Sequence, residues 1–95
     1  MPMVIGVQSW DLELHGCLSL KDKRSVLKPL LAALRRTHNL SVAETGHQDL
    51  WQRALIACAA LGSDRTVVDE TLRAADRMVE EAEGVRIIDT TTVYR

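Results

Sequence analysis

The segment 19–24, Ser-Leu-Lys-Asp-Lys-Arg, holds the residues of this chain that are best suited to bind an anion. Lys21, Lys23 and Arg24 stand in the first turns of a predicted helix, where acidic side chains are normally favoured. A single acid, Asp22, accompanies them. Cations and the free N–H groups of a helix start together form an anion site. The alternative is that the long side chains extend into water while leucines hold the helix in place.

The positive charge continues along this predicted helix. At 100° per residue, four cations lie within about 60° of one another: Lys21, Arg24, Lys28 and Arg35. Segment 19–38 has six cations and one acid, whereas segment 64–83 has three cations and seven acids. Two helices of opposite charge are therefore predicted in a chain of net charge −1. The stripe either binds a negatively charged partner or pairs with the acidic helix, and the sequence leaves both readings open.

Groupings that could do catalysis are weak. Cys17 and Arg24 are separated by one residue more than the loop of a cysteine phosphatase uses, and no base is paired with the thiol. Glu44, His47 and Asp49 would combine carboxylates with an imidazole for acid–base work, but a solvated hairpin explains them equally well. We therefore favour a non-enzymatic protein. A small anion-binding enzyme acting on acyl phosphates is the remaining catalytic hypothesis.

Composition limits the class of protein further. With 95 residues, the chain is long enough for one domain, residues 1–95. Neither cysteine belongs to a C-x-x-C pair and the three histidines are scattered, so we expect no metal and no cofactor. No apolar run approaches the length that crosses a membrane, so we expect no membrane partner. Two cysteines without a secretory signal predict reduced thiols and a cytoplasmic location.

Periodicity divides the chain into six elements, separated for the most part by glycines. Alternation predicts strands, and helical spacing of leucine, valine and alanine predicts helices. Residues 50–61 are apolar on both parities and bounded by glycines, which favours a central strand over a helix. The predicted order is strand 3–14, helix 19–38, strand 39–45, strand 50–61, helix 64–83 and strand 85–94.

Three local features carry specific expectations. The apolar parity of the first strand changes near Gln8 and Ser9, which predicts a bulge there or a strand covered on both faces. Ser19 and Asp22 form a capping pair at the start of the first helix. Pro29 should kink or interrupt that helix, on the side opposite its leucines.

The element order β-α-β-β-α-β predicts an α+β protein with a ferredoxin-like sandwich. Two right-handed crossovers joined by a hairpin place the first and third strands at the centre of a four-stranded antiparallel sheet. Both helices then cover one face of the sheet, and the other face stays open.

Two single residues in the middle of the chain are predicted to make contacts. Glu44, an acid in an otherwise apolar strand, is expected to meet Arg53 or Lys23. Trp51 opens the predicted third strand and is expected to lie at a subunit or partner contact, with a core position as the alternative.

Three blocks of sequence resemble the YlxP-like family of small bacterial proteins: segments 19–24, 39–44 and 49–54. The resemblance implies a ferredoxin-like fold and a cytoplasmic protein, in a family without an established activity. Members are commonly encoded beside translation-initiation and ribosome-maturation factors, which implies a role near RNA or the ribosome. The family's motif residues in this chain are Lys21, Lys23, Arg24, Glu44, Asp49 and Trp51.

The leading hypothesis is a non-enzymatic binding module that contacts structured RNA or a ribosomal surface. Its predicted anion-binding residues are Lys21, Lys23, Arg24, Lys28 and Arg35. The second hypothesis is a protein-interaction or oligomeric module whose open sheet face pairs with a second copy, as in a homodimer, or with another protein. Its predicted interface or structural residues are Glu44, Asp49 and Trp51.

Overall fold

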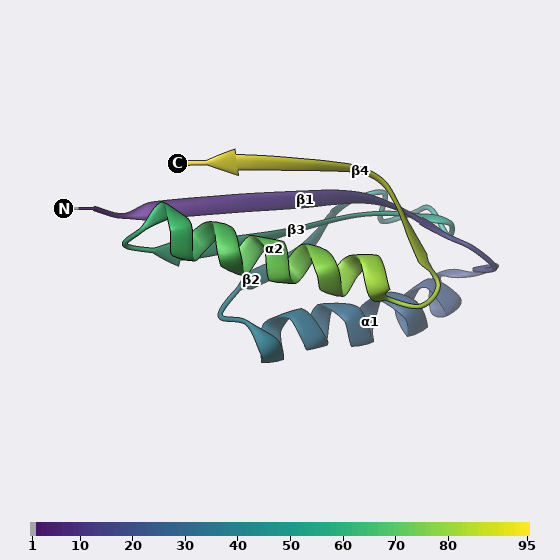
Figure 1. The fold of residues 1–95 in the computed structure, drawn as a ribbon. Helices are drawn as coiled ribbons and strands as arrows, with labels where there is room; N and C mark the ends of the chain where they lie inside the picture. Colours follow the sequence, from purple (N-terminus) through teal and green to yellow (C-terminus); the bar gives the residue numbers. More distant parts are fainter. Residues whose placement is uncertain (1) are drawn as a thin grey trace.

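Both helices lie on one side of a single four-stranded sheet (Figure 1). The computed structural model describes residues 2–95. Its elements are β1 (Val4–Leu14), α1 (Leu20–Thr37), β2 (Ser41–Gly46), β3 (Arg53–Gly62), α2 (Arg65–Glu81) and β4 (Val85–Tyr94). The strand order is β2-β3-β1-β4, and every neighbouring pair is antiparallel. The predicted α+β, ferredoxin-like fold is confirmed, including the central places of β1 and β3 and the choice of a strand for β3.

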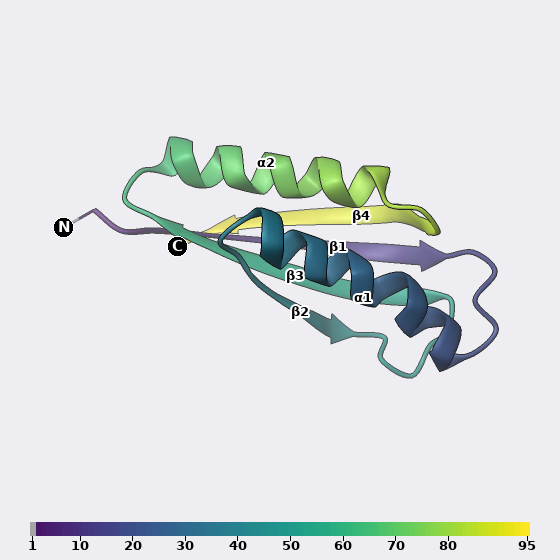
Figure 2. The ribbon, with the colours of Figure 1, turned by 90° about the horizontal axis from the view of Figure 1, so that it is seen from below.

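The two helices divide the covered face between them. Seen from the helix side, α2 lies along β4 and β1, and α1 lies toward the edge formed by β2 (Figure 2). The buried stripe of α2 consists of Val68, Leu72, Ala75 and Val79. None of the helices within residues 2–95 is long and apolar enough to cross a membrane.

Alternation along β1 separates the two faces of the sheet. The even-numbered residues from Gly6 to Leu14 are buried beneath the helices, and the odd-numbered ones are only partly buried. The bulge predicted near Gln8 and Ser9 is wrong, because Gln8 simply occupies one of the buried positions. The sheet is irregular elsewhere: Asp11 pairs with Asp89 and Leu12 with Ile87, so Ile88 is an extra residue in β4.

Polar partners inside the fold explain why a glutamine can take a core position. Asp76 of α2 accepts hydrogen bonds from the Trp10 indole (2.8 Å) and from the Gln8 amide (3.3 Å). The amide oxygen of Gln8 accepts one more from the Thr92 hydroxyl, at 3.0 Å. Buried polar groups are tolerated when they are paired in this way. The contacts join β1, β4 and α2.

The first helix begins as its capping pair predicts. The Ser19 hydroxyl accepts from the Asp22 N–H, and the Asp22 carboxylate accepts from the Leu18 N–H, each at 3.0 Å. Pro29 does not interrupt the helix, which runs continuously to Thr37. Its ring is exposed, on the side away from the buried leucines, and this part of the prediction is confirmed.

The close approach of α2 to Gly6 gives a test of the packing. A methyl group at this position would stand 2.6 Å from Val68 Cγ1 and 2.7 Å from Leu72 Cδ1. We expect Gly6→Ala to lower the free energy of unfolding by about 1–3 kcal/mol, because the well-packed layer must move to make room. Urea denaturation followed by circular dichroism measures this change. Ser9→Ala, on the open face of the same strand, serves as the control, and equal stability of the two variants would contradict the packing.

Candidate functional site

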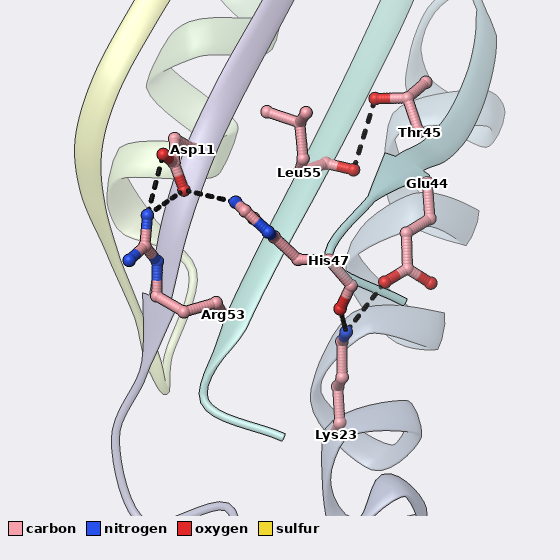
Figure 3. Close-up of polar contacts among 7 residues, drawn as sticks. All are labelled: Asp11, Lys23, Glu44, Thr45, His47, Arg53 and Leu55. Carbon is pink, nitrogen blue, oxygen red and sulfur yellow. Dashed lines mark hydrogen bonds and ion pairs between the residues drawn. The ribbon is translucent and has the colours of Figure 1, made fainter. Parts of the chain in front are cut away.

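Lys23 lies inside the protein although it belongs to the basic run of α1. Its side chain is 3% exposed, and its ammonium group stands 2.9 Å from Glu44 Oε2 (Figure 3). The same group donates a hydrogen bond of 2.6 Å to the His47 carbonyl. The prediction that Glu44 meets Lys23 or Arg53 is confirmed for Lys23. Because its charge is satisfied internally, Lys23 is not part of the exposed basic surface.

His47 connects this ion pair to a second cluster on the open face of the sheet. Its backbone is left-handed, with φ of 56°, a conformation in which histidine is more common than most residues. While its carbonyl accepts from Lys23, its ring nitrogen Nε2 lies 3.6 Å from Asp11 Oδ1. One guanidinium nitrogen of Arg53 binds both oxygens of Asp11 at 2.8 Å. Figure 3 shows the two clusters on either side of His47.

The predicted acid–base grouping of Glu44, His47 and Asp49 is not assembled. Glu44 is engaged with Lys23, and Asp49 is exposed in the loop before β3. The imidazole faces Asp11, which sequence reasoning did not single out. The sequence did contain a signal for Asp11: it is a carboxylate at an odd-numbered position of the first strand, which places it on the same sheet face as Arg53.

Both thiols are buried. Cys17 is 2% exposed, and its carbonyl accepts a hydrogen bond from the Gln52 amide. Burial raises the pKa of the Cys58 thiol to about 11, which keeps it protonated at neutral pH. Among residues 2–95, no three His, Cys, Asp or Glu side chains are grouped so that they could hold a metal ion.

Three of the predicted anion-binding cations form an exposed ridge on α1. We call Lys21, Arg24 and Lys28 the basic ridge; all three are exposed, and no ion pair within residues 2–95 involves any of them. Their spacing of three and four residues keeps them on one side of the helix over about 10 Å. Arg35 is set apart from the ridge, because its guanidinium donates to the Val42 carbonyl at 2.7 Å.

A hollow of about 430 Å³ adjoins the basic ridge. Arg24 and Lys28 line it together with Lys23, Glu44, Gln48, Leu20, Leu27 and Leu31. A larger hollow of about 740 Å³ lies between α1 and α2, but its charged lining residues are the acids Glu81 and Glu83. An anion would therefore be attracted to the smaller hollow and repelled from the larger one.

The opposite charges of the two helices are not neutralised by contacts between them. Within residues 2–95, no ion pair joins α1 to α2. The α1 residues that face the hollow between the helices include Val26, Pro29, Leu30 and Ala33. The side of α1 that faces α2 is thus mainly apolar, and the basic ridge faces elsewhere.

Trp51 lies in the loop ahead of β3 rather than in the strand, which begins at Arg53. Its side chain is 51% exposed, so the alternative of a core position is wrong. Leu50 beside it is 47% exposed. A partner contact at Trp51 stays a prediction, as does association through the open sheet face, where Leu61 is 67% exposed.

Fold and charge together define a small ferredoxin-like α+β protein with a basic ridge on its first helix. The chain belongs to the family described as "Protein of unknown function (DUF503)", which matches residues 5–92. It is 36% identical over 70 residues to the uncharacterized protein YlxP of Bacillus subtilis (strain 168), a match that covers 74% of this chain and 76% of that protein. The predicted membership of a YlxP-like family is confirmed.

Two solved structures are similar to this chain at low sequence identity. The de novo designed protein Foldit4 is 11% identical, with a TM-score of 0.56 over 96% of each chain. A C-terminal segment of the alpha subunit of aIF2 from Pyrococcus abyssi is 16% identical, with a TM-score of 0.47 over all of this chain and 52% of that one. The likeness to Foldit4 concerns the fold alone.

The buried ion pair gives a test of how α1 is anchored. We expect Glu44→Gln to lower the free energy of unfolding by about 1–3 kcal/mol, because it leaves the Lys23 ammonium without its counter-charge. The double variant Glu44→Gln with Lys23→Met should lose much less free energy of unfolding than the two single variants lose together. We expect this difference, the coupling energy, to be at least about 1 kcal/mol. Urea denaturation of all four proteins measures the coupling.

An exposed ion pair on the same molecule provides the comparison. Arg86 is 65% exposed and lies 3.2 Å from Glu13. Replacing Arg86 with Gln should change the free energy of unfolding by no more than about 1 kcal/mol. Strict additivity of the Lys23 and Glu44 changes would show that the internal pair does not hold α1 in place.

Proposed function

We propose that this protein is a non-enzymatic binding module that holds structured RNA against the outer side of α1. The observation that supports this function is the basic ridge, whose three cations are exposed and have no ion-pair partner in residues 2–95. Lys and Arg side chains presented in this way exchange counterions for backbone phosphates.

The spacing of the ridge supports a polyanion rather than a single small anion. Lys21 and Lys28 are seven residues apart, which corresponds to about 10 Å along a helix. Phosphates along one nucleic-acid strand follow each other at a smaller rise than this, so the ridge has room to contact several of them. A lone phosphate would reach only one or two of the three cations.

The charge of the rest of the chain does not favour binding of phosphate. Net charge is −1, and the acids of α2 repel phosphate. Specific contact therefore depends on how α1 is oriented, and the Lys23–Glu44 pair connects the start of this helix to β2. An acyl-phosphate-hydrolysing enzyme is the competing function, and release of phosphate from acetyl phosphate that is lost in Arg24→Ala would favour it.

Salt dependence tests the basic ridge directly. Three phosphate contacts predict a slope of log affinity against log salt of about −2.1 for single-stranded RNA and about −2.7 at duplex-like charge density. Lys21→Glu with Arg24→Glu should lower the affinity and flatten the slope, while stability is kept or slightly raised, because acids suit a helix start. Titration of fluorescent ribosomal RNA fragments at several salt concentrations, with thermal melts in parallel, measures both.

A matched variant separates the ridge from overall charge. Arg73→Glu with Arg77→Glu makes the same change of net charge on exposed positions of α2. It should weaken RNA binding far less than the α1 variant. If the two double variants bind equally well, or if the α1 variant binds like the wild type at low salt, the ridge is not an RNA contact.

A further inference from the structure

The outer edge of β4 leaves an ordered set of backbone groups without partners in the sheet. Ile5 and Arg95 exchange two hydrogen bonds, Ile5 N–H to Arg95 O at 3.0 Å and Arg95 N–H to Ile5 O at 2.7 Å. In an antiparallel pair such residues alternate with ones whose N–H and C=O point away from the partner strand. The register from Arg95 back to Asp89 is unbroken, so Tyr94, Thr92 and Thr90 direct their backbone groups outward.

Within residues 2–95, side chains occupy two of these six outward groups. The Asp89 carboxylate accepts from the Thr90 N–H at 3.0 Å, and the Arg95 guanidinium donates to the Tyr94 carbonyl at 3.2 Å. The groups that remain are the Thr90 carbonyl, the Thr92 N–H and carbonyl, and the Tyr94 N–H. This set is symmetric about Thr92, with donors and acceptors equal in number.

A two-fold axis through Thr92 pairs every one of the remaining groups. In that register Thr92 faces Thr92 of a second copy and exchanges two hydrogen bonds with it. The Tyr94 N–H of each copy then meets the Thr90 carbonyl of the other. Thr91 faces Val93 of the second copy, a pair of β-branched side chains of the kind that stabilises neighbouring strands.

Charge selects this register from the others that the backbone allows. Asp89 faces Asp11 across the β1–β4 pair, and like charges directly opposite are unfavourable. Asp11 is neutralised by Arg53, but no cation within residues 2–95 pairs with Asp89, and no acid there pairs with Arg95. Only the register centred on Thr92 places Asp89 directly opposite Arg95 of the second copy.

We propose that two copies of this chain associate through the outer edges of β4, antiparallel and centred on Thr92, with Asp89 of each copy paired to Arg95 of the other. The two four-stranded sheets then form one continuous sheet. The other edge of the sheet is less suitable, because β2 has only six residues, an irregularity between Glu44 and Gly46, and a carbonyl at Val42 bound by Arg35.

The first test removes the central hydrogen bonds. A single strand pair is smaller than a standard interface, so we expect a reversible monomer–dimer equilibrium between about 1 µM and 1 mM protein in sedimentation equilibrium. Thr92→Pro should weaken association at least about tenfold, because both central N–H donors are lost. Proline is tolerated on an edge strand where the N–H faces outward, and a thermal melt confirms that the variant is folded.

A charge swap tests the register without relying on proline. Asp89→Arg and Arg95→Asp should each weaken association about tenfold, because each places like charges opposite one another twice in the dimer. The double variant with both changes should recover most of the affinity. Glu83→Arg makes the same change of charge as Asp89→Arg at an exposed position outside β4 and should have little effect.

Cross-linking locates the axis. Cα atoms of a hydrogen-bonded antiparallel pair are about 5.5 Å apart, within the range of a disulfide. Thr92→Cys should therefore oxidise to a covalent dimer faster than Val93→Cys. A chain that stays monomeric at about 1 mM overturns the proposal, as does a dimer that keeps its affinity in Thr92→Pro or in both charge variants. Loss of such a dimer in Leu61→Lys would assign association to the open sheet face instead.

Discussion

One buried ammonium group links the first helix to the sheet and to the turn after β2. Lys23 is almost fully buried, and a charge in that position must keep both its counter-ion and its hydrogen bonds. Glu44 supplies the first and the His47 carbonyl the second, so the start of α1, the end of β2 and the turn after it are held together. With Lys23 and the leucines of α1 buried, Lys21, Arg24 and Lys28 lie on the exposed side of the helix. Lys23 thus adds no charge to the exposed surface but helps to hold the helix that carries the exposed cations.

A second polar group organises the other half of the covered face. Asp76 lies between α2 and the sheet and accepts from both Gln8 and Trp10. Through Gln8 the contact extends to Thr92 of β4, so one carboxylate ties three elements together. Each half of the covered face thus contains a buried polar residue with partners: Lys23 at α1, and Gln8 where α2 supplies Asp76. Such sites specify one arrangement of helices on the sheet more narrowly than apolar contacts do.

The basic ridge of α1 and the unpaired outer edge of β4 lie toward opposite edges of the sheet. In the strand order β2-β3-β1-β4, β2 and β4 are the two edge strands of the sheet. The helix α1 lies toward the β2 edge, and β4 forms the opposite edge (Figure 2). Pairing of two copies through β4 would therefore leave both basic ridges exposed at the outer ends of the extended sheet. Binding of RNA and self-association would not compete for the same residues, and a dimer would offer two ridges to one RNA, which increases avidity when both engage.

The sequence by itself determined the six elements, their order and hence the fold, because strand and helix periodicities are local and the crossover rules leave few arrangements. It also identified Lys23, Arg35 and Trp51 as candidate site residues. Only the tertiary structure decided their roles: Lys23 is internal, Arg35 caps a β2 carbonyl, and Trp51 is exposed in a loop. The same holds for Gln8, near which a change of apolar parity predicted a bulge; its side chain is instead buried and bound to Asp76, 68 positions away. A pattern along the chain records which residues are polar, but whether a polar group is buried depends on partners that only folding brings close.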